Sequence, residues 1–476
     1  MRKIKLAVLA ALVLPVMAFT VYNSNCVNLP GTSYVYKNIP FPVTVVGNLP
    51  AMDNMPTTDS TTDPGATLGR VLFYDVSLSA NKTISCGSCH QQKFSFSDTA
   101  RFSTGYNGAK GTRNAMALMH ARFFKDASFF WDERAATLEA QVLMPIQNPI
   151  EMGLTLDTLV SRVAAKSIYP PLFNAAFGST AVTSDKISKA LAQFVRSMNT
   201  FGSRWWQGVN GTPGPAAYTN FATFTAQENF GKSLFMDTAR GNCQSCHTKN
   251  VFVSGAARSN GLDSIYTDQG VGGADGQRNK IGTFKVPSLI NIGLTGPYMH
   301  DGRYQTLAQV INFYSDSIHN TANLSPFLKT PAGRARRPHY SDSEKHALLA
   351  FLNTLTDTLI TTDPRWSNPF CIVSGGREAG TTNANNELIP VLSYAIYPNP
   401  SRTNEAVNLS LIGGQNFDGN IRVYSVSGKL AYQTMYSFGI GNNLVSLPIT
   451  NLDPGIYILQ LEKDGGILAT GRIVKQ

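Results

Sequence analysis

The sequence predicts a mainly α-helical protein that ends in a small β-sandwich. Apolar side chains recur at helical spacing behind a capping Thr or Ser in residues 183–198, and residues 341–344 form a capping box ahead of another apolar helix. A further helical run covers residues 225–235. Beyond residue 390 the pattern changes to alternating apolar residues separated by glycine turns, which is typical of antiparallel strands.

The N-terminus has the features of a signal peptide, which we assign to residues 1–18. The basic stretch MRKIK precedes an apolar run that ends in the small-residue pattern Val16-Met-Ala18. The run is too short to span a bilayer comfortably, and Cys26 lacks the preceding residues of a lipoprotein cleavage site. We therefore expect secretion into an oxidising compartment, where Cys26 and Cys371 can form a disulfide.

Composition and pattern divide the chain into three folded regions. With 43% hydrophobic and 15% charged residues, the 476 residues contain enough apolar material for more than one core. Two regions, residues 60–210 and 220–363, share the order helix, cysteine-containing motif, glycine-rich loops and helix. A polar linker at residues 373–390 separates them from the β-domain at residues 391–476.

Each helical region contains one Cys-x-x-Cys-His motif. The two copies are Cys86-Gly-Ser-Cys89-His90 and Cys243-Gln-Ser-Cys246-His247. In the attachment site of c-type haem, two thiols at this spacing add to the haem vinyl groups and the following histidine ligates the iron. The alternatives are a redox dithiol, which needs no histidine, and half of a zinc site, which would be short of ligands. Two copies in an exported chain favour two covalently bound haems in two cytochrome c-like domains.

The positive charge of the chain gives little support to a nucleic-acid partner. The net charge is +10, but the Lys and Arg residues are scattered and form no stripe. A solvated surface, or docking of an acidic electron-donor protein, explains this charge better.

Several motifs resemble those of the bacterial di-haem cytochrome c peroxidases and their MauG-like relatives. In order they are Leu68-Gly-Arg-Val-Leu-Phe-Tyr-Asp75, Ile84-Ser-Cys86-Gly-Ser-Cys89-His90, Phe130-Trp131-Asp-Glu-Arg134 and Pro297-Tyr-Met-His300-Asp-Gly302. The resemblance covers residues 60 to 360, approximately.

The C-terminal region resembles the sorting domain of the type IX secretion system. Its motifs are Tyr397-Pro-Asn-Pro400, Val423-Tyr-Ser425, Gly428 and Leu452-Asp-Pro-Gly-Ile-Tyr457. This resemblance implies the secretion machinery as a partner, and a route through the periplasm to the cell surface or the medium.

The family resemblance implies a division of labour between the two haems. The haem on His90 would react with peroxide, and the haem on His247 would accept electrons from a small cytochrome or cupredoxin. Trp131 matches an aromatic residue that lies between the haems in the family. The alternative is a core tryptophan beside Phe129 and Phe130, and both interpretations can hold together. The sequence is compatible with assembly of two copies of the chain into a homodimer.

Glu151 and Gln141 match the distal pair of the family. Breaking the O–O bond of peroxide needs a group that moves a proton between its oxygens, and a carboxyl of raised pKa above the iron can do so. Without the resemblance, Glu151 would be interpreted as a solvated loop carboxylate. The family also binds a Ca²⁺ ion between its domains, at positions that match Asn114, Thr295 and the carbonyl of Pro297, all hard oxygen donors.

Two positions depart from the pattern of many family members. The loop after the first motif usually carries a histidine that blocks the iron until the second haem is reduced, and Tyr106 occupies that position here. His120 is the nearest remaining histidine in the sequence and could cap the first iron, but we expect it to occupy a structural position facing the interface between the domains. The sixth ligand of the second haem, usually methionine, corresponds to Tyr314, as in MauG-like proteins. Alternatively Tyr314 packs on an apolar helix face and Met299 ligates the iron.

Three functions are compatible with these residues. The leading one is reduction of hydrogen peroxide to water with electrons from a small redox protein. The second is a MauG-like oxidase that uses high-valent di-haem iron on a protein side chain or an organic substrate. The third is a non-enzymatic electron carrier with both irons six-coordinate. The remaining histidines, which have no partner motif, are expected at the surface: His319, His339 and His346.

Overall fold

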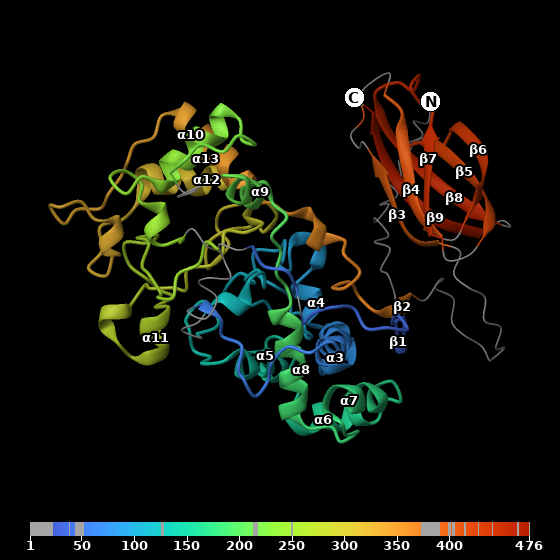
Figure 1. Cartoon of the computed structure of the whole chain (residues 1–476), viewed down its shortest axis with the longest axis horizontal. Coiled ribbons are helices and arrows are strands. Elements are labelled where there is room, and N and C mark those ends of the chain that lie inside the picture. The colour runs from blue at the N-terminus through green and yellow to red at the C-terminus, as the bar shows by residue number, and fades with distance from the viewer. Residues whose placement is uncertain are drawn as a thin grey trace, which may run out of the picture. The chain divides into compact units, whose positions relative to one another are not determined.

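The computed structural model describes residues 22–37, 39–42, 52–124, 128–212, 218–248, 251–372, 391–397, 401, 405–413, 416–426, 428–439, 441–463 and 466–475. The chain divides into two compact units, residues 1–376 and residues 377–476 (Figure 1). The signal peptide and the linker predicted from the sequence lie outside the described residues. No helix among the described residues is long and apolar enough to cross a membrane.

Two crossed helices organise the first half of the larger unit. Helix α3 (Asp63–Tyr74) packs against α8 (Ser184–Arg196), which begins after the predicted capping Thr183 (Figure 1). A Cβ atom on Gly69 would lie 1.9 Å from the carbonyl oxygen of Ala190, so only glycine permits this close crossing. Other helices of this half are α4 (Cys86–Cys89), α5 (Leu138–Gln147), α6 (Leu156–Ala164) and α7 (Tyr169–Phe177).

A second pair of helices repeats the arrangement in the other half. Helix α10 (Ala226–Met236) packs against α13 (Asp342–Asn353). Helix α13 begins after the predicted capping Ser341, and α10 begins after Thr225, the first residue of the predicted helical run. A Cβ atom on Gly231 would lie 1.8 Å from the carbonyl oxygen of Ala347. Figure 1 shows α10, α12 and α13 gathered on one side of this half. Its other helices are α9 (Arg204–Gly211), α11 (Val271–Asp275) and α12 (Leu307–Asn312).

The two glycines belong to one sequence motif that we did not predict. Gly69 and Gly231 each begin Gly-x-x-Leu-Phe-x-Asp, and the motifs end at Asp75 and Asp237, which cap α3 and α10. Each motif precedes one Cys-x-x-Cys-His. The two halves are therefore built on one plan, in which a helix crossing supports the Cys-x-x-Cys-His motif that follows it.

Segments from both ends of the larger unit complete its first hydrophobic core. Strand β1 (Tyr22–Val27) pairs antiparallel with β2 (Phe370–Ile372), two strands that the sequence did not predict. A disulfide between Cys26 and Cys371 joins them, as the oxidising compartment allows. Trp366 is buried in the same core, so the chain returns to the first half after α13.

The C-terminal unit is a β-sandwich, as predicted. Its two sheets have the strand orders β3-β4-β7 and β6-β5-β8-β9, and apolar residues of both sheets share one core. Buried and exposed residues alternate along β5, which explains why this strand was recognisable from the sequence. The strands are β3 (Val391–Tyr397), β4 (Val407–Gly413), β5 (Phe417–Ser425), β6 (Leu430–Phe438), β7 (Gly441–Leu447), β8 (Gly455–Lys463) and β9 (Gly466–Lys475).

Short helical turns connect the elements of the larger unit. Most are 3-10 turns, whereas η7 is a π-helical turn that follows α12 directly. They are η1 (Val76–Leu78), η2 (Gln92–Phe94), η3 (Ala121–Phe123), η4 (Cys243–Ser245), η5 (Arg278–Lys280), η6 (Ile292–Leu294), η7 (Phe313–Ser317), η8 (Pro326–Leu328) and η9 (Thr358–Thr361).

Candidate active site

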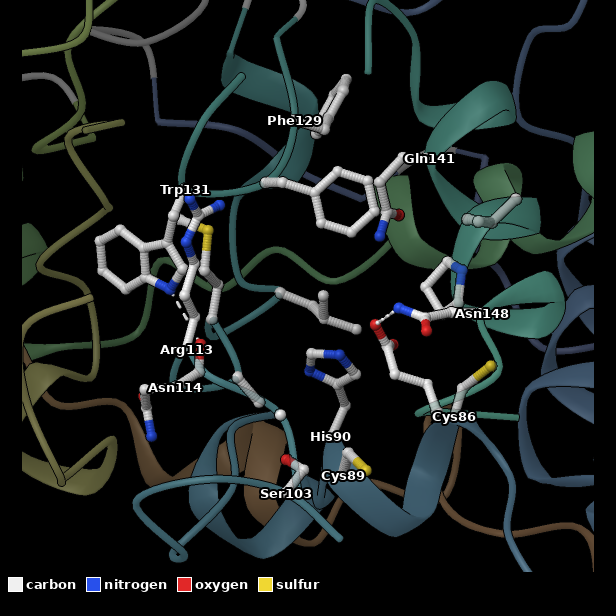
Figure 2. Close-up of a pocket in the computed structure, with 18 of the residues that line it drawn as sticks. Cys86, Cys89, His90, Ser103, Arg113, Asn114, Phe129, Trp131, Gln141 and Asn148 are labelled. Atoms are coloured by element: carbon white, nitrogen blue, oxygen red, sulfur yellow. Dashed lines mark hydrogen bonds between the residues drawn. The ribbon is translucent and has the colours of Figure 1, made fainter. Parts of the chain in front are cut away.

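The first Cys-x-x-Cys-His motif lines a cavity of about 410 Å³. Cys86 and Cys89 lie at the ends of the single-turn helix α4, and the N–H of His90 donates to the Cys86 carbonyl over 2.9 Å. Figure 2 shows the two thiols and the imidazole at one side of the cavity, with Phe129 and Gln141 at the opposite side. Burial raises the pKa of the Cys86 thiol to about 12 and that of Cys89 to about 11.

A backbone carbonyl fixes the orientation of the His90 ring. Nδ1 of His90 lies 3.0 Å from the carbonyl oxygen of Phe96, a hydrogen bond in which the imidazole N–H donates. Ser95 and Phe96 both have positive φ angles, 57° and 59°, so the chain reverses tightly beneath the ring. Burial lowers the pKa of His90, which favours the neutral imidazole that an iron ion requires.

Glu151 and Gln141 line the same cavity, as the sequence interpretation requires. Gln141 lies on α5, and the chain that follows this helix brings Glu151 back to the cavity wall. The Asn148 amide Nδ2 donates to Glu151 Oε1 over 2.7 Å, the hydrogen bond drawn in Figure 2. Burial raises the pKa of the Glu151 carboxyl, opposed by the Asn148 hydrogen bond and by the charge of Arg134. The carboxyl is thus half-buried in the cavity wall, in contrast to the solvated-loop alternative.

Tyr106 packs beside the Glu151 segment. Its N–H donates to the Glu151 carbonyl over 2.9 Å, and its ring covers Gly153, where a Cβ atom would come within 2.3 Å of it. The preceding Gly105 lies so close to the Ile150 carbonyl that a Cβ atom would be 1.6 Å from its oxygen. Close backbone contact therefore holds the loop that carries Tyr106 against the segment that carries Glu151.

His120 has a structural environment, as expected. It is buried, its Nε2 lies 3.1 Å from the Thr200 carbonyl oxygen, and its ring stacks on Phe201. Burial lowers its pKa to about 4. The three other histidines expected at the surface are indeed exposed: His319, His339 and His346.

A second cavity, of about 200 Å³, contains the other motif. Cys243, Cys246 and His247 line it, and Nδ1 of His247 lies 3.4 Å from the Phe252 carbonyl oxygen. This repeats the contact between His90 and Phe96 with a longer distance. Burial lowers the pKa of His247 to about 4. Each cavity thus offers two thiols and one oriented neutral imidazole, the donor set that a covalently attached haem requires.

Tyr314 and Met299 both line the second cavity. Tyr314 lies in the π-helical turn η7, a deviation from α-helix that often marks functional sites. The amide Nδ2 of Asn260 lies 3.3 Å from the Tyr314 hydroxyl and 3.6 Å from the Met299 sulfur. Burial raises the pKa of the Tyr314 phenol. Both axial candidates of the sequence interpretation are therefore present.

Trp131 contributes to the walls of both cavities. Its indole Nε1 donates to the carbonyl of Asn114 over 2.8 Å, which fixes the ring (Figure 2). Its ring centroid lies 6.5 Å from that of His300. The side chain is half-buried beside Phe129 and Phe130, so its place in the wall agrees with both interpretations of its role.

A backbone hydrogen bond connects two of the segments that contain the three residues matched to a calcium site. Asn114 and Thr295 are buried, and the peptide bond before Pro297 is cis. The Asn114 N–H donates to the His300 carbonyl over 2.8 Å, which links the segment of Asn114 to the loop that contains Pro297. The side-chain amide of Asn114 donates to the Ala100 carbonyl.

The sequence interpretation missed a charged cluster that joins the two halves. Arg113 Nη1 lies 2.6 Å from Asp132, and its Nε lies 2.7 Å from Asp268 of the second half. His300 stacks on Phe284 at 3.8 Å and lies 4.0 Å from Asp268. Asp132 belongs to the motif Phe130-Trp131-Asp-Glu-Arg134, but Asp268 has no local signal in the sequence, so its ion pair with Arg113 could not be predicted.

Lys285 is a second residue that the sequence interpretation missed. It is 6% exposed and borders both cavities. Its Nζ donates to the Ser128 carbonyl over 2.7 Å and lies 3.6 Å from the ring centroid of Phe124. Its N–H donates to the Trp131 carbonyl over 2.8 Å. Buried lysines are unusual in folded proteins, so the groups that contact Lys285 are of interest. No local sequence pattern predicts these groups.

Comparison with protein families agrees with both resemblances. Residues 63–213 match the family model described as di-haem cytochrome c peroxidase. Residues 395–476 match the model of the secretion-system C-terminal sorting domain.

Characterised relatives carry both names used for this family. The methylamine utilization protein MauG of Methylorubrum extorquens is 32% identical over 301 residues, covering 60% of this chain and 77% of the relative. The cytochrome c551 peroxidase of Nitrosomonas europaea is 32% identical over 285 residues, covering 56% and 80%. MauG of Paracoccus denitrificans is 31% identical over 356 residues, covering 62% and 89%.

Solved structures are similar over the larger unit. A MauG-like protein associated with microbial copper homeostasis is 31% identical with a TM-score of 0.59, covering 67% of this chain and 96% of that one. A dihaem peroxidase of Burkholderia thailandensis, at 21% identity and a TM-score of 0.51, shares the fold and covers 72% and 96%.

Proposed function

The chain belongs to the di-haem cytochrome c peroxidase and MauG family, and on this premise we propose that it reduces hydrogen peroxide to water with electrons from a small redox protein. The family binds two c-type haems, and each cavity offers the donor set that one haem requires. We assign the first haem to Cys86, Cys89 and His90, and the second to Cys243, Cys246 and His247. When bound, the haems supply iron for electron transfer to peroxide.

The half-buried carboxyl of Glu151 in the cavity wall is the observation that carries this proposal. The reaction takes up two protons and two electrons for each peroxide and releases two water molecules. Burial raises the pKa of the Glu151 carboxyl, which favours its protonated form. Asn148 fixes the position of this carboxyl, and Gln141 supplies a second polar group in the same wall. The chain therefore provides a proton donor where peroxide must be cleaved.

Trp131 borders both cavities and is suited to carry electrons between them. In this assignment the second cavity receives electrons from a small cytochrome or cupredoxin, one at a time. The haem proposed for the first cavity would use these electrons in pairs, because each peroxide takes up two. The third possibility raised by the sequence, an electron carrier without catalysis, leaves the carboxyl of Glu151 in the cavity wall without a role.

A MauG-like oxidase is the second candidate, and Tyr314 is the observation that favours it. Phenolate is a hard, anionic ligand that favours higher iron oxidation states, whereas the Met299 thioether favours Fe(II). Tyrosine ligation would therefore suit oxidation of a protein side chain or an organic substrate. Burial of the phenol beside Asn260 places Tyr314 at the wall of the second cavity, but Met299 lies there too.

Two further assignments accompany the proposal. Asn114, Thr295 and the carbonyl of Pro297 would bind a calcium ion between the two halves. The C-terminal unit is a sorting domain of type IX secretion, which places the protein at the cell surface or outside the cell. We propose that the chain crosses the periplasm on this route, after removal of residues 1–18, and that a homodimer is one assembly to be tested.

Steady-state turnover tests the choice of function. Full-length protein with both haems, mixed with peroxide and a reduced small cytochrome, should oxidise two cytochrome molecules for each peroxide consumed. Failure to oxidise the cytochrome, with rapid peroxide consumption coupled to oxidation of an organic substrate, would favour the oxidase. No reaction with peroxide would identify the electron carrier.

A further inference from the structure

His90 and His247, which would hold the two irons, are each oriented by a carbonyl group, and both carbonyls lie in short loops. The loop below His90 contains Ser95 and Phe96, and the loop below His247 contains Val251 and Phe252. A carbonyl that accepts the Nδ1–H bond fixes the tautomer and the ring plane and raises the basicity of the other nitrogen. Whatever holds these two loops therefore influences both iron sites.

One segment of the second half contacts both loops. The Ser288 hydroxyl donates to the Val251 carbonyl over 3.0 Å, directly before Phe252. Three residues later, the Asn291 amide Nδ2 donates to the Ser95 hydroxyl over 2.8 Å, directly before Phe96. We call residues 288–291 the bridging segment.

The bridging segment is itself well anchored. Asn291 is fully buried, its Oδ1 accepts a hydrogen bond from the Asp357 N–H over 2.6 Å, and its own N–H donates to the Leu355 carbonyl. The Ser288 hydroxyl also accepts from the Ile290 N–H over 3.2 Å. Ser95 is buried as completely as Asn291. Water cannot replace these partners, so the bonds should be worth more than exposed ones.

We propose that the bridging segment is a positioning element that sets the imidazole hydrogen bonds of both haem irons. Asn291 acts on the first site through Ser95 and Phe96, across the boundary between the two halves. Ser288 acts on the second site through Val251 and Phe252. The inference rests on the proposed binding of haem by His90 and His247. It adds a connection between the two sites that does not pass through Trp131.

The backbone of Asn291 determines which variant tests its side chain. Its φ angle is +60°, a conformation that asparagine and glycine adopt more easily than alanine. Asn291→Gly therefore removes the amide without straining the chain. Ser95 also has a positive φ angle, so Ser95→Gly is the matching change on the other side of the bond. Ser288→Ala removes the contact with the second loop.

The readout is the ferric electron paramagnetic resonance signal and the midpoint potential of each haem in the full-length protein. Without the hydrogen bond from Asn291 to Ser95, the loop that contains the Phe96 carbonyl is held less firmly. The hydrogen bond from His90 to this carbonyl then weakens, and the imidazole becomes a poorer electron donor to the iron. Asn291→Gly and Ser95→Gly should each shift the signal of the first haem and raise its potential, with the larger change at that haem. The double variant should shift them no further than either single variant. Ser288→Ala should act mainly on the second haem.

Two control variants separate positioning from a general loss of stability. Asn199 is a buried asparagine whose amide donates to the Arg196 carbonyl over 2.6 Å, and Ser188 is a buried serine bonded to the Asp185 carbonyl. Asn199→Gly and Ser188→Ala should leave both haem signals unchanged. Equal shifts at both haems in the bridging variants, or shifts no larger than in the controls, would overturn the inference.

The same measurements distinguish this inference from the haem assignment beneath it. A wild-type protein without two ferric haem signals would refute the assignment of His90 and His247. A wild-type protein with both signals, unaltered in Asn291→Gly and Ser95→Gly, would refute only the role of the bridging segment.

Discussion

The Asn148 amide donates to the Glu151 carboxylate over 2.7 Å at the end of α5. This bond stabilises the ionised carboxylate, yet burial has the larger effect and leaves the pKa raised. Glu151 is thus held in position by its neighbour, and burial shifts its carboxyl towards the protonated form. That combination is useful for a general acid, because the proton is available and its direction is fixed.

Replacing Glu151 tests this role directly. Glu151→Gln keeps the size of the side chain but removes the transferable proton, so the reaction with peroxide should slow by about 10²- to 10⁴-fold. Haem absorption spectra should change little, and stopped-flow mixing with peroxide measures the rate. Asp185→Asn, an exposed carboxylate-to-amide change on α8, is the control and should keep the wild-type rate. An unaltered rate in Glu151→Gln would mean that Glu151 is an ordinary loop carboxylate without a role in the peroxide reaction.

The raised pKa of Glu151 also predicts a pH dependence. A general acid works in its protonated form, so the peroxide reaction should be fastest below the pKa of Glu151 and slow as the pH rises through it. Because burial moves this pKa upwards, the decline should begin above the pH expected for an ordinary glutamate. The pH–rate profile of Glu151→Gln should lack this decline. A wild-type profile with no decline above the ordinary glutamate range would contradict the prediction.

Covalent attachment of two haems is the simplest chemical prediction. Denatured protein should keep both groups, and its intact mass should exceed that of the mature chain by two haems. Replacing Cys86 and Cys89 together by alanine should remove one haem, and replacing Cys243 and Cys246 should remove the other. Bound zinc, or a mass that corresponds to one haem, would refute the assignment.

Tyr314 and Met299 can be separated as ligands because each has a near-isosteric replacement. If the phenolate ligates the second iron, Tyr314→Phe should change the low-spin ferric signal of that haem and raise its potential. Met299→Leu should leave both unchanged. A changed signal in Met299→Leu with an unchanged signal in Tyr314→Phe would identify Met299 as the ligand of the second iron. That result would weaken the case for a MauG-like oxidase.

The end of the catalytic unit lies later in the chain than residue 363, where the sequence interpretation placed it. Trp366 is buried, its Nε1 donates to the Ser197 hydroxyl over 3.0 Å, and Cys371 forms the disulfide with Cys26. A chain truncated after Ile372 should therefore retain both haems and the peroxide reaction.

A chain truncated after Asp363 should be much less stable than one truncated after Ile372. Loss of Trp366 alone would cost about 3–5 kcal/mol, to which the loss of the disulfide adds. Thermal unfolding of the two truncated proteins measures the difference. If both unfold at the same temperature, residues 364–372 do not stabilise the first core.

Some features of this protein were predictable because their signals are local. Each Cys-x-x-Cys-His motif is a short local pattern, and Thr225 and Ser341 cap helices through hydrogen bonds from residues three positions later. Along β5, buried and more exposed residues alternate because successive side chains of a strand point to opposite faces of the sheet. Positions of Glu151 and Tyr314 were reached only through resemblance to a family. Their spacing alone favoured a solvated loop and an apolar helix face.

The tertiary structure decided the contacts that connect distant segments. The bond between Asn291 and Ser95 spans 196 positions, and that between Trp366 and Ser197 spans 169. A serine or asparagine side chain has the same donors and acceptors wherever it lies, so its partner depends on which loops the packed helices bring together. For that reason the sequence by itself determined which groups we assign to haem attachment. The fold determined which residues hold those groups in place.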